Sequence, residues 1–354
     1  MEKNILIIGG YGSVGSVITR HLSEIYPGRV IVAGRNYNKA EQLSKELNHR
    51  AVPLRCDIAD TGKYSELLKD VALVIMCIDQ ENTDFVEHCF LEEINYIDIT
   101  AGYEFLSEVE KLNGIAVENN AIGVLSVGLA PGITNLLAKH CKNQLEEAMQ
   151  LDIHVLLGSG EKHGTAAYQW MLNNLNTEYS VKGIGEAHVV KSFSEPKKVY
   201  FNSEIGKRKT FLFNLSDQHV LADNMDGVQV FTRVCFDSLI MTNLIAFAEM
   251  TGLSAILKKE LIQDIVIKLI NSISLGSDIF MAKVIGRGYD GSTYKCSLSG
   301  HGEGYVTGLV AAEVAKRLIS SSHPTGVYHL EQLFEPQEAI IALLETEESL
   351  KAIL

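Results

Sequence analysis

The sequence predicts an α/β fold in two parts: a doubly wound parallel sheet first, then an inserted α+β domain. Short apolar runs alternate with helix-like stretches over about the first 130 residues, a pattern that implies right-handed crossovers between parallel strands. After Gly132 the pattern changes to hairpin-like pairs of strands with helices between them. We expect domains at 1–130 and 131–304, and carboxyl-terminal helices at 305–354 that pack back onto the first domain.

Each element of the first domain follows from a local pattern. Ala72–Ile78 is a continuous apolar run, which is typical of a strand buried on both faces of a parallel sheet. The other strands are expected at Ile5–Ile8, Arg29–Ala33, Ala51–Asp57, Tyr96–Thr100 and Gly123–Gly128. The helices between them are expected at Ser16–Leu22, Arg35–Leu47, Asn82–Glu92 and Leu106–Asn119.

The second domain lacks this regular alternation. Lys198–Phe201 and Thr210–Phe213 flank a segment that contains Gly206, and so predict an antiparallel hairpin. Arg208, in the Lys-Arg-Lys run of that segment, is expected to be a solvated charge. Further strands are expected at Leu151–Leu157, Val228–Phe236, Met281–Gly288 and Tyr294–Ser299, and helices at Ser238–Glu249, Leu257–Ser272, Thr307–Ser320 and Pro336–Ile353.

A glycine-rich turn follows the first strand directly. Gly10, Gly12 and Gly15 fit the G-x-G-x-x-G pattern between a strand and a helix, as in a Rossmann dinucleotide-binding domain. Gly10 permits the tight turn, Gly12 lets a pyrophosphate approach the backbone, and Gly15 lets the helix pack closely. The pyrophosphate would lie on the free N–H groups at the positive end of the helix. The alternative is a glycine-rich turn that serves packing alone.

The end of the second strand predicts which dinucleotide binds. Where NAD-selective sites carry a carboxylate for the ribose 2′-hydroxyl, this chain has Gly34 followed by Arg35. A carboxylate would repel a 2′-phosphate, whereas a guanidinium can pair with it through two parallel hydrogen bonds. We therefore expect NADP(H) in preference to NAD(H). The alternative for Arg35 is a surface charge, and Lys39 is either a second cation for the phosphate or a solvated helix residue.

The composition limits the possible partners. The 354 residues carry a formal net charge of −13, which argues against nucleic acid and anionic membranes. None of the six cysteines forms a C-x-x-C pair, so we expect no metal site and thiols in a reducing compartment. No apolar stretch approaches the roughly 20 residues of a membrane helix, and no leader peptide is expected. A cytoplasmic location fits these observations best.

Motifs along most of the chain recur in one family. They are the Gly9–Gly15 turn, Asp57, Tyr96–Thr100, Gly128–Asn135, Gly164-Thr165, Thr307–Ala312 and Gly326–Tyr328. On these motifs the chain resembles the saccharopine dehydrogenase family, which includes saccharopine reductases and lysine 6-dehydrogenase-like proteins. The resemblance implies a pyridine-nucleotide enzyme that acts on a carbon–nitrogen bond of a small amino-acid-derived substrate, and a homodimer contact in the second domain. One departure is Ala130, where saccharopine reductases commonly have an aspartate implicated in proton handling.

The glycine turn and the resemblance together predict the cofactor contacts. They are Gly10, Tyr11, Gly12, Ser13, Val14, Gly15, Gly34, Arg35, Asp57, Ile78, Pro131 and Gly132.

The candidate catalytic residues lie in loops, because ligands of an open α/β sheet bind beyond the carboxyl ends of its strands. Reduction of an imine or carbonyl needs a proton donor, and the reverse reaction needs a base. Tyr103 follows the fifth strand and matches a tyrosine of the saccharopine reductase pattern, or else its ring packs under the loop. His163 is the second candidate, because an imidazole with a pKa of about 6.5 suits proton transfer at neutral pH. The alternative is an exposed loop histidine.

An amino-acid substrate needs cations for its carboxylates. Arg233 and Arg287 lie in or beside predicted strands of the second domain and fit this role, with surface ion pairs as the alternative. Glu104 and Thr165 either contact the substrate or cap helices, and the resemblance adds Asn135. Two other functions stay open: reduction of a carbonyl or enoyl bond, and nucleotide binding by a non-catalytic regulator.

Overall fold

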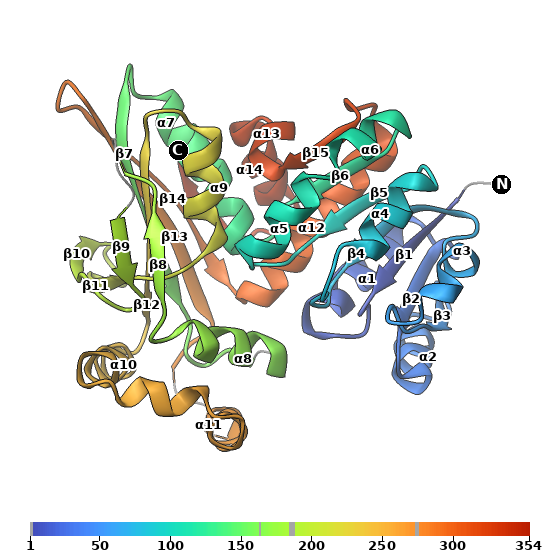
Figure 1. Ribbon diagram of the computed structural model, residues 1–354, viewed down its shortest axis with the longest axis horizontal. Helices are drawn as coiled ribbons and strands as arrows, with labels where there is room; N and C mark the ends of the chain where they lie inside the picture. Colours follow the sequence, from blue (N-terminus) through green and yellow to red (C-terminus); the bar gives the residue numbers. More distant parts are fainter. Residues whose placement is uncertain (1–2, 163, 184–187, 273–275) are drawn as a thin grey trace. The chain divides into compact units, whose positions relative to one another are not determined.

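The computed structural model (Figure 1) divides the chain into two compact units. Unit 1 consists of Met1–Gly132 and Gly304–Glu335, and unit 2 of Ile133–Glu303 and Pro336–Leu354. The predicted α/β class is confirmed, since each unit contains a seven-stranded sheet and the sheet of unit 1 is doubly wound. The residues that the structure describes are 3–162, 164–183, 188–272 and 276–354.

Unit 1 is built on parallel strands in the order β15-β6-β5-β4-β1-β2-β3. In β4, which lies between β1 and β5, five of six residues are buried, as its continuous apolar run predicts. The chain order reverses between β1 and β4, and ligands bind at such a switch point. The strands are β1 (Asn4–Ile8), β2 (Val30–Gly34), β3 (Ala51–Arg55), β4 (Val71–Met76), β5 (Asn95–Asp98), β6 (Ile122–Leu125) and β15 (Gly326–His329).

Helices cover this sheet through apolar side chains. Phe85 and Phe90 of α4 lie in one buried cluster with Leu6 and Met76, and burial of each ring contributes roughly 1.5–3 kcal/mol. The helix predicted at Leu106–Asn119 is two helices, α5 and α6, in the structure. The helical elements are α1 (Ser13–Ile25), α2 (Tyr37–Glu46), η1 (Thr61–Lys63), α3 (Tyr64–Leu67), α4 (Asp84–Leu91), α5 (Tyr103–Glu110), α6 (Asn113–Glu118), α12 (Glu303–Ser320) and α13 (Leu330–Leu333).

Unit 2 is built on a mixed sheet in the order β10-β11-β12-β7-β13-β14-β16. The central strand β7 is parallel to β12 and antiparallel to β13, and the predicted hairpin is β10 with β11. The strands are β7 (Ala148–Leu157), β10 (Lys197–Tyr200), β11 (Lys207–Leu212), β12 (Gln229–Phe236), β13 (Ile279–Gly288), β14 (Thr293–His301) and β16 (Lys351–Ile353). A separate antiparallel pair consists of β8 (Glu178–Val181) and β9 (His188–Lys191).

One helix of unit 2 packs unusually close to this sheet. A Cβ on Gly286 of β13 would lie 2.7 Å from the sulfur of Cys141 in α7, so only glycine permits this approach. An irregular turn, η2 (Leu129–Ile133), precedes α7. The helical elements of the unit are α7 (Thr134–Asn143), α8 (Thr165–Asn174), α9 (Ser216–Asn224), α10 (Leu239–Thr251), η3 (Leu253–Lys258), α11 (Glu260–Ser272) and α14 (Pro336–Thr346).

The carboxyl-terminal segment differs from the prediction. We expected all of 305–354 to pack on the first domain, with one helix at Pro336–Ile353. The structure instead divides the segment: Gly304–Glu335 belongs to unit 1, but Pro336–Leu354 belongs to unit 2, where α14 contacts α7. Apolar residues at helical spacing continue past the end of α14, yet the last of them form the edge strand β16. Pairing with β14 supplies their backbone hydrogen bonds, so tertiary contact overrides the local pattern.

Charged side chains lie in the interior of unit 2. Asp152 of β7 is fully buried, and its carboxylate accepts hydrogen bonds from Arg233 (2.8 Å) and Lys197 (2.5 Å). His154 is also fully buried, with its Nδ1 2.9 Å from the hydroxyl oxygen of Thr210. Burial lowers the pKa of His154 to about 3, because the surroundings solvate an imidazolium poorly.

This burial predicts a pH-dependent stability. His154 stays neutral in the folded chain but gains a proton in the unfolded chain below a pKa of about 6.5. The contribution of neutral His154 is therefore complete above that pH and is lost as the pH falls. Between about pH 6.5 and about pH 5, this residue alone lowers the free energy of unfolding by about 2 kcal/mol.

Urea unfolding at the two pH values measures this contribution. The variant His154→Gln has no titrating group at this position, so its free energy of unfolding should fall less than that of wild type between the two pH values. His188→Gln, at an exposed histidine of β9, is the control and keeps the wild-type pH dependence. Equal pH dependence in all three proteins would contradict the prediction.

Candidate functional site

The candidate site of unit 1 begins at the turn between β1 and α1. Gly9 has a left-handed backbone (φ +75°), and its carbonyl oxygen accepts a hydrogen bond from the N–H of Gly12 at 2.8 Å. A Cβ on Gly15 would lie 2.3 Å from that same oxygen, and a Cβ on Gly10 would lie 2.9 Å from the carbonyl oxygen of Ile7. Only glycine fits these two positions. The helix therefore approaches the turn as closely as the G-x-G-x-x-G motif requires.

The first turn of α1 is suited to bind an anion. Its N-cap is Gly12, no side chain caps the helix, and the first turn contains no acidic residue. The amides of Ser13, Val14 and Gly15 have no acceptor within the helix, because the first amides of a helix lack one. They lie at the positive end of the helix dipole. These residues fit the pyrophosphate of a dinucleotide.

Tyr11 shapes the end of β2. A Cβ on Gly34 would lie 2.6 Å from the hydroxyl oxygen of Tyr11, and that oxygen accepts a hydrogen bond from the N–H of Asn36 at 3.0 Å. The tyrosine ring therefore lies against Gly34, and a side chain at position 34 would require the ring to move. Arg35 is exposed, and no residue of the described ranges forms an ion pair with it. Lys39 is exposed in the next turn.

Two further expected cofactor contacts follow β3 and β4. Ile78, which is 41% exposed, lies against the glycine turn, since its Cγ2 would be 2.7 Å from a Cβ on Gly9. Asp57 is exposed, and its carboxylate accepts a hydrogen bond from the N–H of Ala59 at 3.1 Å. The structure thus brings Ile78 to the turn, whereas the carboxylate of Asp57 stabilises its own loop.

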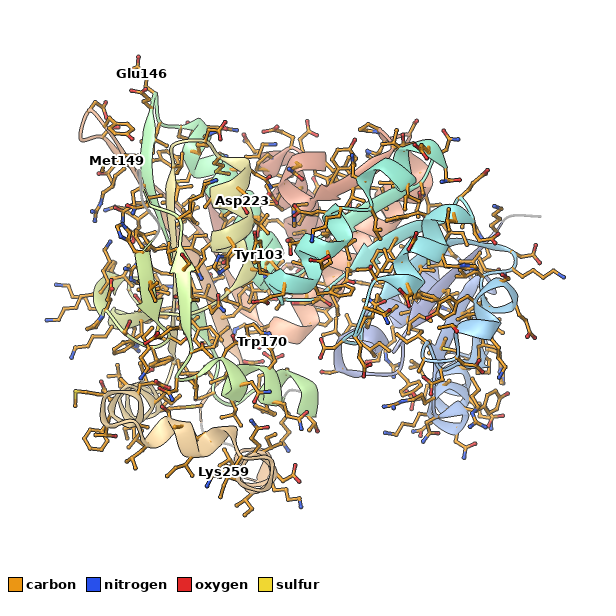
Figure 2. All side chains as sticks on the ribbon, in the orientation of Figure 1. Tyr103, Glu146, Met149, Trp170, Asp223 and Lys259 are labelled. Atoms are coloured by element: carbon orange, nitrogen blue, oxygen red, sulfur yellow. The ribbon has the colours of Figure 1, made fainter. Side chains whose placement is uncertain are left out.

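A buried polar cluster lies at the ends of β4 and β5. The fully buried carboxylate of Asp98 accepts hydrogen bonds from the Tyr96 hydroxyl (2.5 Å), the Thr100 N–H (2.7 Å) and the Gln80 side-chain amide (3.3 Å). The Gln80 amide also donates to the Tyr96 hydroxyl at 2.7 Å. The bond to Thr100 holds the loop that leads to Tyr103, the first residue of α5 (Figure 2). Asp98 therefore holds in place the loop that carries the candidate proton donor.

Burial also changes the protonation of this edge of the sheet. It raises the pKa of Asp98, although hydrogen bonds from Thr100 and Tyr96 favour the carboxylate and oppose the change. Burial and then the nearby Asp98 charge raise the pKa of the Tyr96 hydroxyl well above its usual value. Burial raises the pKa of Asp79, in the loop after β4, as well. Two carboxyl groups here thus hold protons at a higher pH than usual.

A second buried network holds the loop after β6. Ser126 has a left-handed backbone (φ +55°), and its Oγ lies 2.7 Å from Nδ1 of His329, whose Nε2 lies 2.7 Å from a carboxylate oxygen of Glu110. A carboxylate only accepts, so Nε2 donates to Glu110, and Nδ1 is the ring nitrogen that is hydrogen-bonded to the Ser126 hydroxyl. A Cβ on Gly132 (φ +133°) would lie 3.0 Å from the Ser126 carbonyl oxygen. The network thus anchors η2, which contains Pro131 and Gly132.

Comparison with known proteins identifies the domain that carries this turn. Residues 5–124 match the family described as "Saccharopine dehydrogenase NADP binding domain". These residues are a saccharopine dehydrogenase NADP binding domain. The resemblance predicted from the glycine turn and the later motifs is confirmed for this part of the chain.

A solved structure shares the fold of the whole chain. Saccharopine dehydrogenase (L-Glu forming) from Saccharomyces cerevisiae aligns with a TM-score of 0.67, at 14% identity, over 99% of this chain and 100% of that chain. At this identity the likeness shows the fold alone.

Curated relatives match shorter stretches. Glutamyl-tRNA reductase of Carboxydothermus hydrogenoformans is 31% identical over 121 residues, which are 32% of this chain and 25% of that protein. Glutamyl-tRNA reductase of Methanococcus maripaludis is 23% identical over 220 residues, which are 60% of this chain and 53% of that protein. The chain thus spans from a quarter to about half of the length of these relatives.

Two predicted site residues lie in the first turns of helices, and a third lies inside a helix. Glu104 is exposed in the first turn of α5 in the NADP binding domain, where an acid interacts favourably with the helix dipole. Thr165 is exposed as the first residue of α8, and Gly164 rather than the threonine is the N-cap. Asn135 is fully buried in α7 of unit 2. His163 lies outside the described residues.

The two predicted arginines have different surroundings. Arg233 is 6% exposed, and its guanidinium pairs with Asp152, so its charge is already compensated inside unit 2. Arg287 is exposed near the end of β13. Of the two, only Arg287 presents an uncompensated charge to solvent, within the residues that the structure describes.

Several residues that organise unit 1 had no predicted role. Asp98 belongs to the Tyr96–Thr100 motif, and one pattern in the sequence could have predicted its contact with Tyr96. Residues two apart in a strand share a face, so the side chains of Tyr96 and Asp98 lie on the same face at the end of β5. Ser126 and His329 are 203 positions apart and carry no local signal.

Neither a candidate membrane-spanning helix nor a cluster of metal-binding side chains occurs in the described residues. Across the described ranges, no helix combines the length and apolar character needed to span a membrane. In those same ranges, no three His, Cys, Asp or Glu side chains gather closely enough to hold a metal ion. All six cysteines are free thiols.

The Ser126 network predicts a stability effect. Ser126→Ala leaves the buried Nδ1 of His329 without its hydrogen-bond partner, so we expect the free energy of unfolding to fall by about 1–3 kcal/mol. Ser65→Ala removes a similar Ser–His contact, to His88, at an exposed site and should change the stability little. Urea unfolding followed by circular dichroism measures both. Equal effects of the two substitutions would contradict the proposed importance of the buried network.

Proposed function

We propose that this chain is an NADP(H)-dependent oxidoreductase that acts on a carbon–nitrogen bond of a small, amino-acid-derived substrate. One observation carries the proposal: the uncapped first turn of α1, set against a glycine turn, lies in a saccharopine dehydrogenase NADP binding domain. The fold shared with yeast saccharopine dehydrogenase supports it. The bound nucleotide would supply hydride chemistry, and the chain would bind and orient it and manage a proton.

Residues at the end of β2 support NADP(H) over NAD(H). Position 34 is a glycine and carries no carboxylate, so the repulsion that excludes a 2′-phosphate is missing. The exposed Arg35 guanidinium follows directly and is free to pair with the phosphate. The pyrophosphate would lie on the amides of Ser13, Val14 and Gly15.

Replacement of Arg35 tests this preference. Arg35→Ala should weaken NADPH binding about 10- to 100-fold, since hydrogen bonds to a charged group contribute about 1.5–3 kcal/mol. NADH binding should stay unchanged, because NADH has no 2′-phosphate. Fluorescence titration of both nucleotides measures the effect, and Lys69→Ala, at an exposed lysine of the same unit, is the charge-matched control.

Two results would contradict these assignments. Equal weakening of both nucleotides would remove Arg35 as the phosphate partner. Failure of wild type to bind either nucleotide would overturn the proposed function.

We assign to Tyr103 the donation of the proton that the reduction requires. Reduction of a C=N bond places hydride on carbon and a proton on nitrogen, and the phenol hydroxyl is the proposed donor. Asp98 holds the loop before α5 through the Thr100 N–H, so it acts as a positioning residue. His163 remains the second candidate donor.

Tyr103→Phe tests this role. The substitution keeps the ring and removes the hydroxyl, so we expect turnover to fall about 100-fold or more with unchanged NADPH affinity. Steady-state rates of NADPH oxidation on a panel of amino-acid, imine and ketone substrates measure this, with exposed Tyr289→Phe as the control. Unchanged turnover would exclude Tyr103 as donor. Activity on ketones or enones alone would favour a carbonyl or enoyl reductase. Tight NADPH binding without turnover of any substrate would favour a non-catalytic regulator.

The remaining expectations concern assembly and location. We propose a homodimer in the cytoplasm, as the resemblance and the composition predict. Neither nucleic acid nor membrane is proposed as a partner of the catalytic site.

A further inference from the structure

A small cavity of unit 2 is lined mainly by cations. It has a volume of about 270 Å³ and lies between the β10–β11 hairpin and α10, which are labelled in Figure 1. Lys198 of β10 lines it together with Lys207, Arg208 and Lys209 of β11. None of the residues that line it is acidic. This is unexpected in a chain with a net charge of −13, because acidic side chains are plentiful elsewhere.

These four charges are not compensated by the protein. No ion pair joins them to an acidic side chain of the described residues. Lys198 and Lys209 lie directly opposite each other in the hairpin, and like charges at such positions are destabilising. The arrangement therefore costs stability unless an anion lies between them.

Arg208 is less exposed than the three lysines that line the cavity. Its Nη1 donates to the carbonyl oxygen of Lys207 at 3.2 Å, which holds the guanidinium beside the backbone. Its Nε is buried, and within the described residues it has no hydrogen-bond acceptor. A buried donor without an acceptor is rare and costly.

The opposite wall belongs to α10. Leu239, Thr242 and Asn243 lie in the first two turns of this helix, whose first turn contains no acid. The hydroxyl of Thr242 bonds to the backbone of Phe236 and thereby fixes the start of the helix. The first turn is capped, because the Ser238 hydroxyl oxygen accepts a hydrogen bond from the N–H of Met241 at 3.2 Å. The exposed side-chain amide of Asn243 is the hydrogen-bond donor that this wall offers.

We propose that this cavity binds a small multivalent anion, with phosphoryl or carboxylate groups. The volume suits a compact ligand, and the apolar Leu239 wall suits one that is partly enclosed. A nucleic acid is disfavoured, because the remainder of the chain is strongly acidic. The site is separate from the glycine turn, whose residues belong to unit 1, and does not depend on the proposed function.

Calorimetric titration of the full chain tests the proposal. Pyrophosphate and citrate are the two probes, and they distinguish a phosphoryl from a carboxylate ligand. We expect at least one to bind, and Lys207→Ser with Lys209→Ser to weaken it about tenfold or more. Binding of pyrophosphate at the glycine turn would not respond to this change. Lys295→Ser with Lys351→Ser removes the same charge from exposed positions of the same sheet and should leave the affinity unchanged.

A second variant keeps the test decisive if the double substitution prevents folding. Asn243→Asp adds a negative charge to the wall and should weaken the same probe. The proposal is overturned if neither probe binds wild type, or if both double variants weaken binding equally. It is also overturned if a short RNA duplex binds more tightly than either probe and depends on Lys207 and Lys209, because the surface would then be a nucleic-acid interface.

Discussion

The close approach of α1 to the β1 turn is the contact on which the nucleotide site depends. It exists because Gly15 has no side chain: a Cβ would lie 2.3 Å from the carbonyl oxygen of Gly9. With the helix held there, its first amides lie at the carboxyl edge of the sheet without any protein cap. The same turn places Tyr11 against Gly34 at the end of β2, so one short segment provides the uncapped amides and also shapes the neighbouring strand end.

Two buried polar networks then order the loops around this turn. Asp98 ties its own strand to Thr100 and the start of α5, and Ser126 ties the end of β6 to His329 at the end of β15. Each network satisfies groups that would be costly to bury alone. Hydrogen bonds at the ends of β5 and β6 therefore hold the segments that lead to the candidate donor Tyr103 and to Pro131–Gly132.

Unit 2 uses its charges in two opposite ways. Inside the sheet, Asp152 compensates Arg233 and Lys197, so these charges are structural. At the cavity beside the β10–β11 hairpin, cations such as Lys207 and Arg208 gather, and none of the residues that line the cavity is acidic, although the chain as a whole is acidic. We had expected Arg233 either to bind a substrate carboxylate or to form a surface ion pair. In the structure it is buried and pairs with Asp152, a residue 81 positions away in the chain.

Local patterns alone determined the α/β class, the glycine turn and the hairpin of unit 2. These depend on residues close in sequence: a glycine at each fixed offset, apolar runs of strand length, and Gly34 next to Arg35. Tertiary structure alone decided the pairing of β16 with β14 and the Ser126–His329 contact. It also decided which arginine is compensated. The physical reason is that hydrogen bonds and charge compensation act over a few ångströms in space, between partners that the chain separates by up to 219 positions, as for Glu110 and His329.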